Sequence, residues 1–135
     1  MSKKITLIKS EELAKVDYSY ASKVPEGWDI LFLAGACPIN KDGEVDLIND
    51  YTGQIKLCLE NLKKVLKECG ASLEDVAYTR ILVASQNRED LVDVWSVISG
   101  EFGEHNVPST LMGVTVLGYE NQLVEIEAVV AVERK

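Results

Sequence analysis

Residues 123–132 place two carboxylates inside an otherwise apolar run, a pattern that constrains the fold more than any other in the chain. Side chains alternate between the two faces of a β-strand, so Val124 and Ile126 share one face while Glu125 and Glu127 share the other. Because most exposed sheet faces carry charge, a solvated face is the simpler interpretation of the two acids. The alternative is a cleft in which one glutamate acts as a general acid or base. The pattern alone favours the solvated face.

Two further segments have the apolar spacing of amphipathic helices. Residues 52–69 carry an apolar side chain every three or four positions, and Gly70 follows as a C-cap glycine. The second helix begins after Asn87, a candidate N-cap, and ends near Gly103. Its apolar face is formed by Leu91, Trp95, Ile98 and Phe102. Each helix therefore has one stripe to bury against a sheet.

The strand pattern completes an α+β fold. Strands are predicted for residues 5–8, 20–24, 29–36, 76–84, 111–116 and 123–132. The order of three strands, helix, strand, helix and two strands predicts a single mixed β-sheet with both helices packed on one face. The opposite face then carries apolar side chains at Ile30, Phe32, Leu82 and Val114. An uncovered patch of this kind predicts self-association, with clefts at the subunit boundaries.

The length and the cysteine and histidine content limit the class of protein. With 135 residues the chain is expected to form one domain, residues 1–135. Three cysteines without a CxxC pair argue against a disulfide framework or a zinc knuckle, and one histidine, His105, excludes a multi-histidine metal site. We therefore expect no metal site. The chain shows neither a secretory signal nor an apolar run of membrane length, which predicts a cytoplasmic protein with no membrane partner.

The net charge argues against a nucleic-acid partner. At −8 the chain repels phosphate backbones, whereas nucleic-acid binders present clustered Lys and Arg. The one basic cluster contains Lys63, Lys64 and Lys67, at helical spacing and close to Glu60 and Glu68. This pattern is typical of a mixed-charge solvated helix face.

Five segments, taken in order, carry a family resemblance that runs almost end to end. They are Tyr18-Ser19, Leu33-Ala34-Gly35-Ala36-Cys37-Pro38 with the Asp42-Gly43 turn, Gln54 with Leu59-Glu60-Asn61-Leu62, Phe102-Gly103-Glu104-His105, and Leu123-Val124-Glu125-Ile126-Glu127-Ala128. Their order and spacing resemble the reactive intermediate deaminase family. This family is also called Rid or YjgF and is sometimes labelled L-PSP endoribonuclease or translation inhibitor.

The resemblance implies a chorismate-mutase-like subunit assembled as a homotrimer with a central β-barrel and three pockets between neighbours. The implied activity is hydrolysis of imine or enamine acids to keto acids and ammonia without a cofactor. By resemblance, Glu125 positions the attacking water, the backbone near Gly35 holds the substrate and Tyr18 lines the pocket. For Glu125, the resemblance therefore favours a pocket role over a solvated one.

The sequence departs from the family pattern where the substrate carboxylate would bind. The family's Pro-Ala-Arg-Ser segment is replaced by Pro108-Ser109-Thr110-Leu111, so Thr110 stands in place of the carboxylate-binding arginine and marks an arginine-lacking branch. Loss of that charge-assisted pair costs about 1.5–3 kcal/mol of binding free energy. Trp95 and Ala34 also replace the asparagine and serine often found at their positions. The pocket is therefore expected to be less polar.

Three further residues have two interpretations each. Arg80 is either an outward charge on a strand or a displaced cation for an anionic ligand. Cys37 is either a small buried residue or a reactive thiol. Trp95 is either a core residue or part of the pocket, as its family position suggests.

The function expected from these residues is that of an interface pocket for a small molecule. The first hypothesis is a cofactor-independent hydrolase of imines or enamines, with Glu125 as the catalytic residue and Tyr18, Gly35, Trp95 and Thr110 binding the substrate. The alternative is a non-catalytic small-ligand-binding or regulatory trimer, which the presence of Thr110 favours. An RNA-cleaving translation inhibitor is the third hypothesis, and the acidic charge opposes it.

Overall fold

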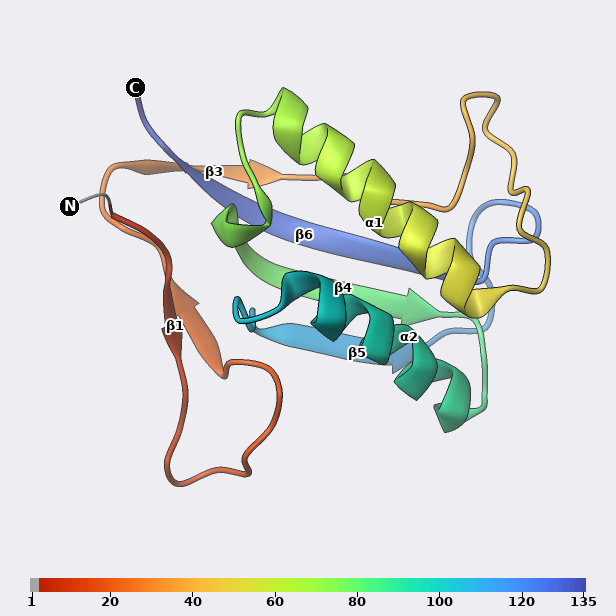
Figure 1. Cartoon of the computed structure of the whole chain (residues 1–135), viewed down its shortest axis with the longest axis horizontal. Helices are drawn as coiled ribbons and strands as arrows, with labels where there is room; N and C mark the ends of the chain where they lie inside the picture. The colour runs from red at the N-terminus through yellow and green to blue at the C-terminus, as the bar shows by residue number, and fades with distance from the viewer. Residues whose placement is uncertain (1–2) are drawn as a thin grey trace.

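The computed structural model describes residues 3–135 and confirms the predicted fold class: two helices cover one face of a mixed four-stranded sheet (Figure 1). The elements are β1 (Thr6–Ile8), β2 (Ala21–Lys23), β3 (Trp28–Phe32), α1 (Tyr51–Glu68), the 3₁₀ turn η1 (Leu73–Asp75), β4 (Val76–Val83), α2 (Arg88–Phe102), β5 (Ser109–Gly113) and β6 (Val124–Glu133). Apart from the short 3₁₀ turn, this is the predicted order. Neither helix is long and apolar enough to cross a membrane, within residues 3–135.

The main sheet has the strand order β3-β6-β4-β5, with β4 and β5 parallel and the other pairs antiparallel. The prediction of one single sheet was wrong, because β1 and β2 pair with each other in a separate ribbon (Figure 1). The ribbon is joined to the sheet through side chains: the Ser22 hydroxyl donates to the Ala77 carbonyl at 2.7 Å, and Ile5 packs against Ala77 and Ala131.

The ends of α1 follow from local hydrogen bonding. The Asp50 carboxylate accepts a bond from the backbone N–H of Gly53 at 2.9 Å and caps the first turn. At the other end Gly70 adopts a φ of 73°, and the N–H of Ala71 donates to the Leu66 carbonyl at 2.8 Å. This is the Schellman geometry that a glycine after the last helical turn permits, so the predicted stop at Gly70 is confirmed.

Element boundaries differ from the prediction where turns replace regular pairing. The strand expected over residues 29–36 ends at Phe32, although Ala36 still meets Ile126 through an isolated bridge. The strand expected over residues 111–116 runs instead from Ser109 to Gly113, so Val114, predicted on the sheet face opposite the helices, lies outside the strand. Helix α2 begins after Asn87 as predicted, but the Asn87 side chain makes no capping hydrogen bond.

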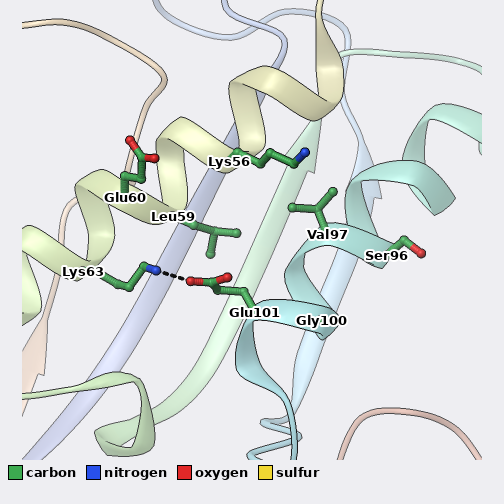
Figure 2. A pocket seen from close by; sticks show the side chains of 8 residues that line it. All are labelled: Lys56, Leu59, Glu60, Lys63, Ser96, Val97, Gly100 and Glu101. Carbon is green, nitrogen blue, oxygen red and sulfur yellow. Dashed lines mark hydrogen bonds and ion pairs between the residues drawn. The ribbon is translucent and has the colours of Figure 1, made fainter.

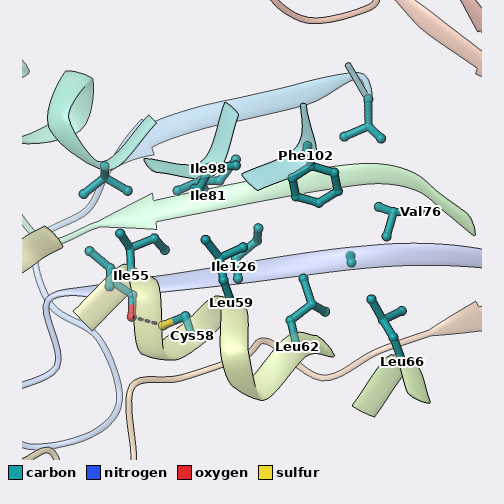
Figure 3. Close-up of a cluster of buried hydrophobic side chains, with 14 of the residues drawn as sticks. Ile55, Cys58, Leu59, Leu62, Leu66, Val76, Ile81, Ile98, Phe102 and Ile126 are labelled. Atoms are coloured by element: carbon teal, nitrogen blue, oxygen red, sulfur yellow. Dashed lines mark hydrogen bonds between the residues drawn. The ribbon is translucent and has the colours of Figure 1, made fainter. Parts of the chain in front are cut away.

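The core lies between the helices and the sheet, where the two predicted helical stripes meet (Figure 3). The fully buried large side chains include Ile55, Leu62 and Leu66 from α1, Val94 and Ile98 from α2, Val76, Ile81 and Val83 from β4, and Val124, Ile126 and Val130 from β6. Burying each of these aliphatic groups contributes about 1.5–3 kcal/mol to stability. The core thereby fixes which side of β6 faces away from the helices.

The sheet face opposite the helices, called the open face below, is covered at Ala131 by Ile5 next to the β1–β2 ribbon and elsewhere carries exposed apolar side chains. Phe32 is 81% exposed and Ile30 is 43% exposed on β3, and Tyr78 and Met112 are also exposed. Leu82, predicted on this face, is half-buried. A single chain therefore presents the apolar surface that the sequence predicted.

Candidate functional site

The two acids of β6 lie on the open face, as the alternation predicted. Val124, Ile126 and Ala128 are buried toward the helices, while Glu125 and Glu127 are half-buried on the other side. In the register of the sheet, Glu125 lies opposite Leu82 and Glu127 lies opposite Arg80 on β4. The two carboxylates thus share a face but have different neighbours.

Glu127 is neutralised by an arginine. The Arg80 guanidinium donates from Nη2 to both carboxylate oxygens of Glu127, at 2.8 and 2.9 Å. The hydrogen bonds and the charge of Glu127 raise the pKa of Arg80 above its usual value. Arg80 is therefore an exposed cation on the open face, already engaged by Glu127.

Glu125 is held by neutral donors instead. Its Oε1 accepts from the Cys37 thiol and from the Gln122 amide, each at 3.1 Å. Within residues 3–135 Glu125 forms no ion pair. A Cβ on Gly35 would come within 2.6 Å of the Glu125 Cδ, so a glycine is needed there to leave room for the carboxylate. Gly35, Cys37 and Gln122 therefore form the immediate surroundings of this acid.

Cys37 is a hydrogen-bond donor rather than a thiolate. Burial, and then the hydrogen bond to Glu125, raise the pKa of the Cys37 thiol from 9.0 to about 12. At neutral pH the thiol stays protonated, and only the thiolate is nucleophilic. This state argues against the reactive-thiol interpretation of Cys37.

Tyr18, Trp95 and Thr110 meet at a second place, beside the edge strand β5. Together with Ser109 and Leu111 they line a cavity of about 410 Å³, called the edge cavity below. The rings of Tyr18 and Trp95 are edge-to-face, with centroids 6.3 Å apart. Among residues 3–135, the lining contains two aromatic rings and the three hydroxyl groups of Tyr18, Ser109 and Thr110, and no charged side chain. Its size is within the range of small-molecule pockets.

Two neighbours fix the polar groups of the edge cavity. The Trp95 indole N–H donates to the Asp17 carboxylate at 2.8 Å, while part of the same side chain packs against the core. The Thr110 hydroxyl accepts from the Tyr78 hydroxyl at 2.8 Å, which leaves its own hydrogen for a ligand. Trp95 therefore belongs both to the core and to the cavity.

In one chain the edge cavity and Glu125 are separate. Thr110 lies on β5 and Glu125 on β6, with β4 between them. Two inter-strand spacings make about 10 Å across the sheet. Arg80 lies between the two places, as the register partner of Thr110 on one side and of Glu127 on the other. One subunit therefore cannot bring Glu125 and Thr110 to the same small molecule.

The sequence interpretation missed Gln122, which is buried and directly contacts Glu125. It stands just before the apolar run of β6, where a polar residue is typical of a turn. The sequence places no catalytic role on His105, and in the structure its ring Nε2 lies 2.8 Å from the Val76 carbonyl oxygen. In the part of the chain that the structure describes, no group of three or more His, Cys, Asp or Glu side chains is placed to hold a metal.

A second cavity, of about 450 Å³, lies between α1 and α2 on the side away from the sheet (Figure 2). Figure 2 shows the Lys63 ammonium directed at the Glu101 carboxylate across this groove, and the two groups form an ion pair. Lys56 and Glu60 extend the mixed charge along α1. The basic cluster singled out in the sequence is thus part of a solvated helix face, as predicted.

Comparison with known proteins gives the class to which this fold and site belong. Residues 10–132 match the family described as endoribonuclease L-PSP. A RutC family protein of Pyrococcus abyssi is 33% identical over 112 residues, which cover 83% of this chain and 84% of that protein. The 3-aminoacrylate deaminase RutC of Acinetobacter baylyi is 29% identical over 55 residues, covering 41% of this chain and 44% of that protein.

Solved structures agree with the sequence matches. The crystal structure of YyfB, a conserved Rid family protein of unknown function from Yersinia pestis, superposes with a TM-score of 0.89. It is 27% identical and covers 96% of this chain and 100% of that one. The chain therefore belongs to the endoribonuclease L-PSP family, the Rid or YjgF family that its motifs resemble.

Proposed function

We propose that the protein is a cofactor-independent hydrolase of small imines or enamines, acting in pockets between the subunits of a homotrimer. The observation that carries the proposal is the environment of Glu125, a carboxylate on the open face that accepts hydrogen bonds from two neutral donors and, within residues 3–135, forms no ion pair. Such a group is free to accept a proton from water. Family membership supports the proposal, as does the distant similarity to the deaminase RutC.

The proposed reaction needs one water and one base. Glu125 accepts a proton from the water while the water oxygen forms a bond to the imine carbon. Glu125 returns this proton to the nitrogen, which gives a carbinolamine. The hydroxyl proton of the carbinolamine then passes through Glu125 to the amine while the carbon–oxygen double bond forms and the carbon–nitrogen bond breaks, so that ammonia leaves and a carbonyl compound remains. An enamine reacts in the same way after tautomerising to the imine. The residues supply positioning and proton transfer, so the reaction balances without a redox partner.

The proposed trimer joins the two places that one chain keeps apart. Glu125 and Gly35 of one subunit would face the edge cavity of its neighbour, with Tyr18, Trp95 and Thr110. The apolar side chains of the open face, Phe32 above all, support such an assembly because association removes them from water.

The proposed substrate carries little or no negative charge. Thr110 offers one neutral hydrogen bond, and none of the described residues that line the edge cavity is cationic. The nearest candidate cation, Arg80, is held by Glu127, so an anionic group would have to compete with that carboxylate. A carboxylate-free imine therefore fits the cavity better than an imino acid.

A second candidate is a ligand-binding or regulatory trimer without catalysis, and Thr110 is the observation that favours it. An RNA-cleaving activity, which the family label suggests, is opposed by the net charge of −8 and by the pairing of Lys63 with Glu101. Binding of single-stranded RNA is therefore measured beside the two imine substrates described below.

The test is ammonia release above the uncatalysed rate from two imines generated in situ: 2-iminobutyrate from threonine dehydratase, and an uncharged aliphatic imine from a flavin amine oxidase. We expect the wild type to accelerate the uncharged imine and Glu125→Gln to abolish that acceleration. Thr110→Arg should improve turnover of 2-iminobutyrate about ten- to a hundredfold, the value of one charge-assisted pair. Glu133→Gln, at the exposed end of β6, is the matched control.

Three outcomes separate the candidates. Acceleration that survives in Glu125→Gln would contradict the catalytic role of Glu125. No acceleration with either imine, together with saturable binding of small carbonyl compounds, would replace the hydrolase by the binding protein. Binding of single-stranded RNA that persists at physiological salt would favour the third hypothesis.

A further inference from the structure

Two neutral side chains from different loops converge on one oxygen of Glu125. The Cys37 sulfur and the Gln122 Nε2 each lie 3.1 Å from Oε1, and Cys37 is 88 residues away in the sequence. The other oxygen, Oε2, lies next to the position that a Cβ on Gly35 would occupy. The two oxygens of the carboxylate therefore have different environments.

The orientation of Gln122 is fixed by its own hydrogen bonds. Its Oε1 accepts from the Tyr119 N–H at 3.0 Å, and its Nε2 also donates to the Val124 carbonyl at 3.0 Å. Only 5% of the residue is exposed. With the amide oxygen engaged by a backbone donor, the amide nitrogen must face Glu125.

Helix α1 holds both loops from which these donors come. The Asn61 side-chain amide donates to the Cys37 carbonyl at 2.9 Å. The Gln54 amide donates to the Asn121 carbonyl at 3.0 Å, and its oxygen accepts from the Leu123 N–H at 2.8 Å. Gln54 is completely buried. A rigid element thereby sets the position of both donors.

We propose that Cys37 and Gln122 are positioning residues, forming a neutral clamp that fixes Oε1 of Glu125 and leaves Oε2 to hold the attacking water. The proposal rests on the function proposed above and deepens it. Neutral donors orient a carboxylate without cancelling its charge, whereas an arginine partner, such as the one on Glu127, would reduce its ability to accept a proton. The clamp thus explains why only one of the two acids on this face is suited to act on water.

The first test needs no substrate. The ionisable groups near Cys37 are Glu125 and the buried Cys58, and the negative charge of Glu125 opposes formation of the Cys37 thiolate. Alkylation of Cys37 by iodoacetamide is followed by peptide mass spectrometry across a pH series. In Glu125→Gln we expect the midpoint of alkylation to lie at lower pH than in the wild type. If the midpoint is one pH unit lower, alkylation of Cys37 at a fixed pH below both midpoints is about tenfold faster. Identical midpoints in the two proteins would overturn the clamp.

The second test compares two substitutions of Cys37. Cys37→Ser retains a donor and should keep most of the turnover, whereas Cys37→Ala loses the donor and should lower kcat about tenfold with little change in KM. Equal kcat values for both variants, at equal thermal stability, would show that the thiol only fills space.

The two tests separate this inference from the proposed function. A lower alkylation midpoint in Glu125→Gln without imine turnover in the wild type leaves the clamp in place and removes the hydrolase. Imine turnover that depends on Glu125 but is unchanged in Cys37→Ala, with identical midpoints, removes the clamp and leaves the hydrolase.

Discussion

At the scale of residues, Glu125 and Glu127 are two positions apart on one strand face and differ in what donates to them. Arg80 balances the charge of Glu127, whereas Cys37 and Gln122 hold Glu125 without balancing its charge. A carboxylate paired with a cation contributes to structure, and one with neutral donors remains available for proton transfer. The neighbours, rather than the residue type, distinguish their roles.

Gly35 gives the first prediction at this scale. A methyl group at Gly35 would overlap the Glu125 side chain, which can move only by leaving its donors. We expect Gly35→Ala to lower imine turnover at least about tenfold while costing about 1 kcal/mol of stability, the cost of a displaced rotamer. Thermal unfolding and ammonia release measure the two effects. The control is Gly100→Ala in α2, where a Cβ meets nothing within 4 Å and should be neutral or stabilising.

At the scale of elements, α1 has two functions. Its apolar stripe forms one side of the core, and its polar residues Gln54 and Asn61 hold the loops beside Glu125. Buried polar groups of this kind are stable only when they are fully hydrogen-bonded. The helix therefore couples packing of the core to the geometry of the site.

Gln54 carries the prediction for this scale. Its side chain satisfies the carbonyls of Leu47 and Asn121 and the N–H of Leu123. Gln54→Leu would leave these buried groups without their partner, so we expect a loss of about 3 kcal/mol in the free energy of unfolding. Urea denaturation measures the loss. Gln86→Leu, at an exposed loop position, should change stability by less than about 0.5 kcal/mol. Equally small losses of unfolding free energy in both variants would contradict the role of Gln54 in holding the loops.

At the scale of the whole molecule, the proposed trimer would explain both the exposed apolar side chains of the open face and the separation of the edge cavity from Glu125. Each subunit would supply the acid to one pocket and the aromatic cavity to another. In a closed ring of three, every subunit makes the same two contacts with its neighbours. Heterologous contacts that close into a ring leave no interface patch unpaired. Activity would then depend on assembly.

The assembly prediction is tested on the open face. Phe32→Glu places a charge on the most exposed apolar side chain of that face, and we expect it to give monomers and to abolish turnover. Sedimentation equilibrium at micromolar concentration measures the oligomeric state, which we expect to be a trimer for the wild type. Val92→Glu, at a 61% exposed position on α2, should leave the trimer intact. A monomeric wild type would remove the interface pocket from the proposal.

The sequence by itself determined the helical stripes, the stop at Gly70 and the alternation of β6, because these depend on residues a few positions apart. Tertiary structure decided which acid has a cation and which has a thiol, because the partners of Glu125 and Glu127 lie 88 and 47 residues away. It also separated β1 and β2 from the main sheet, since strand propensity does not specify which strand is the partner. Contacts between residues far apart in the sequence depend on how the core packs, so local sequence patterns do not predict them.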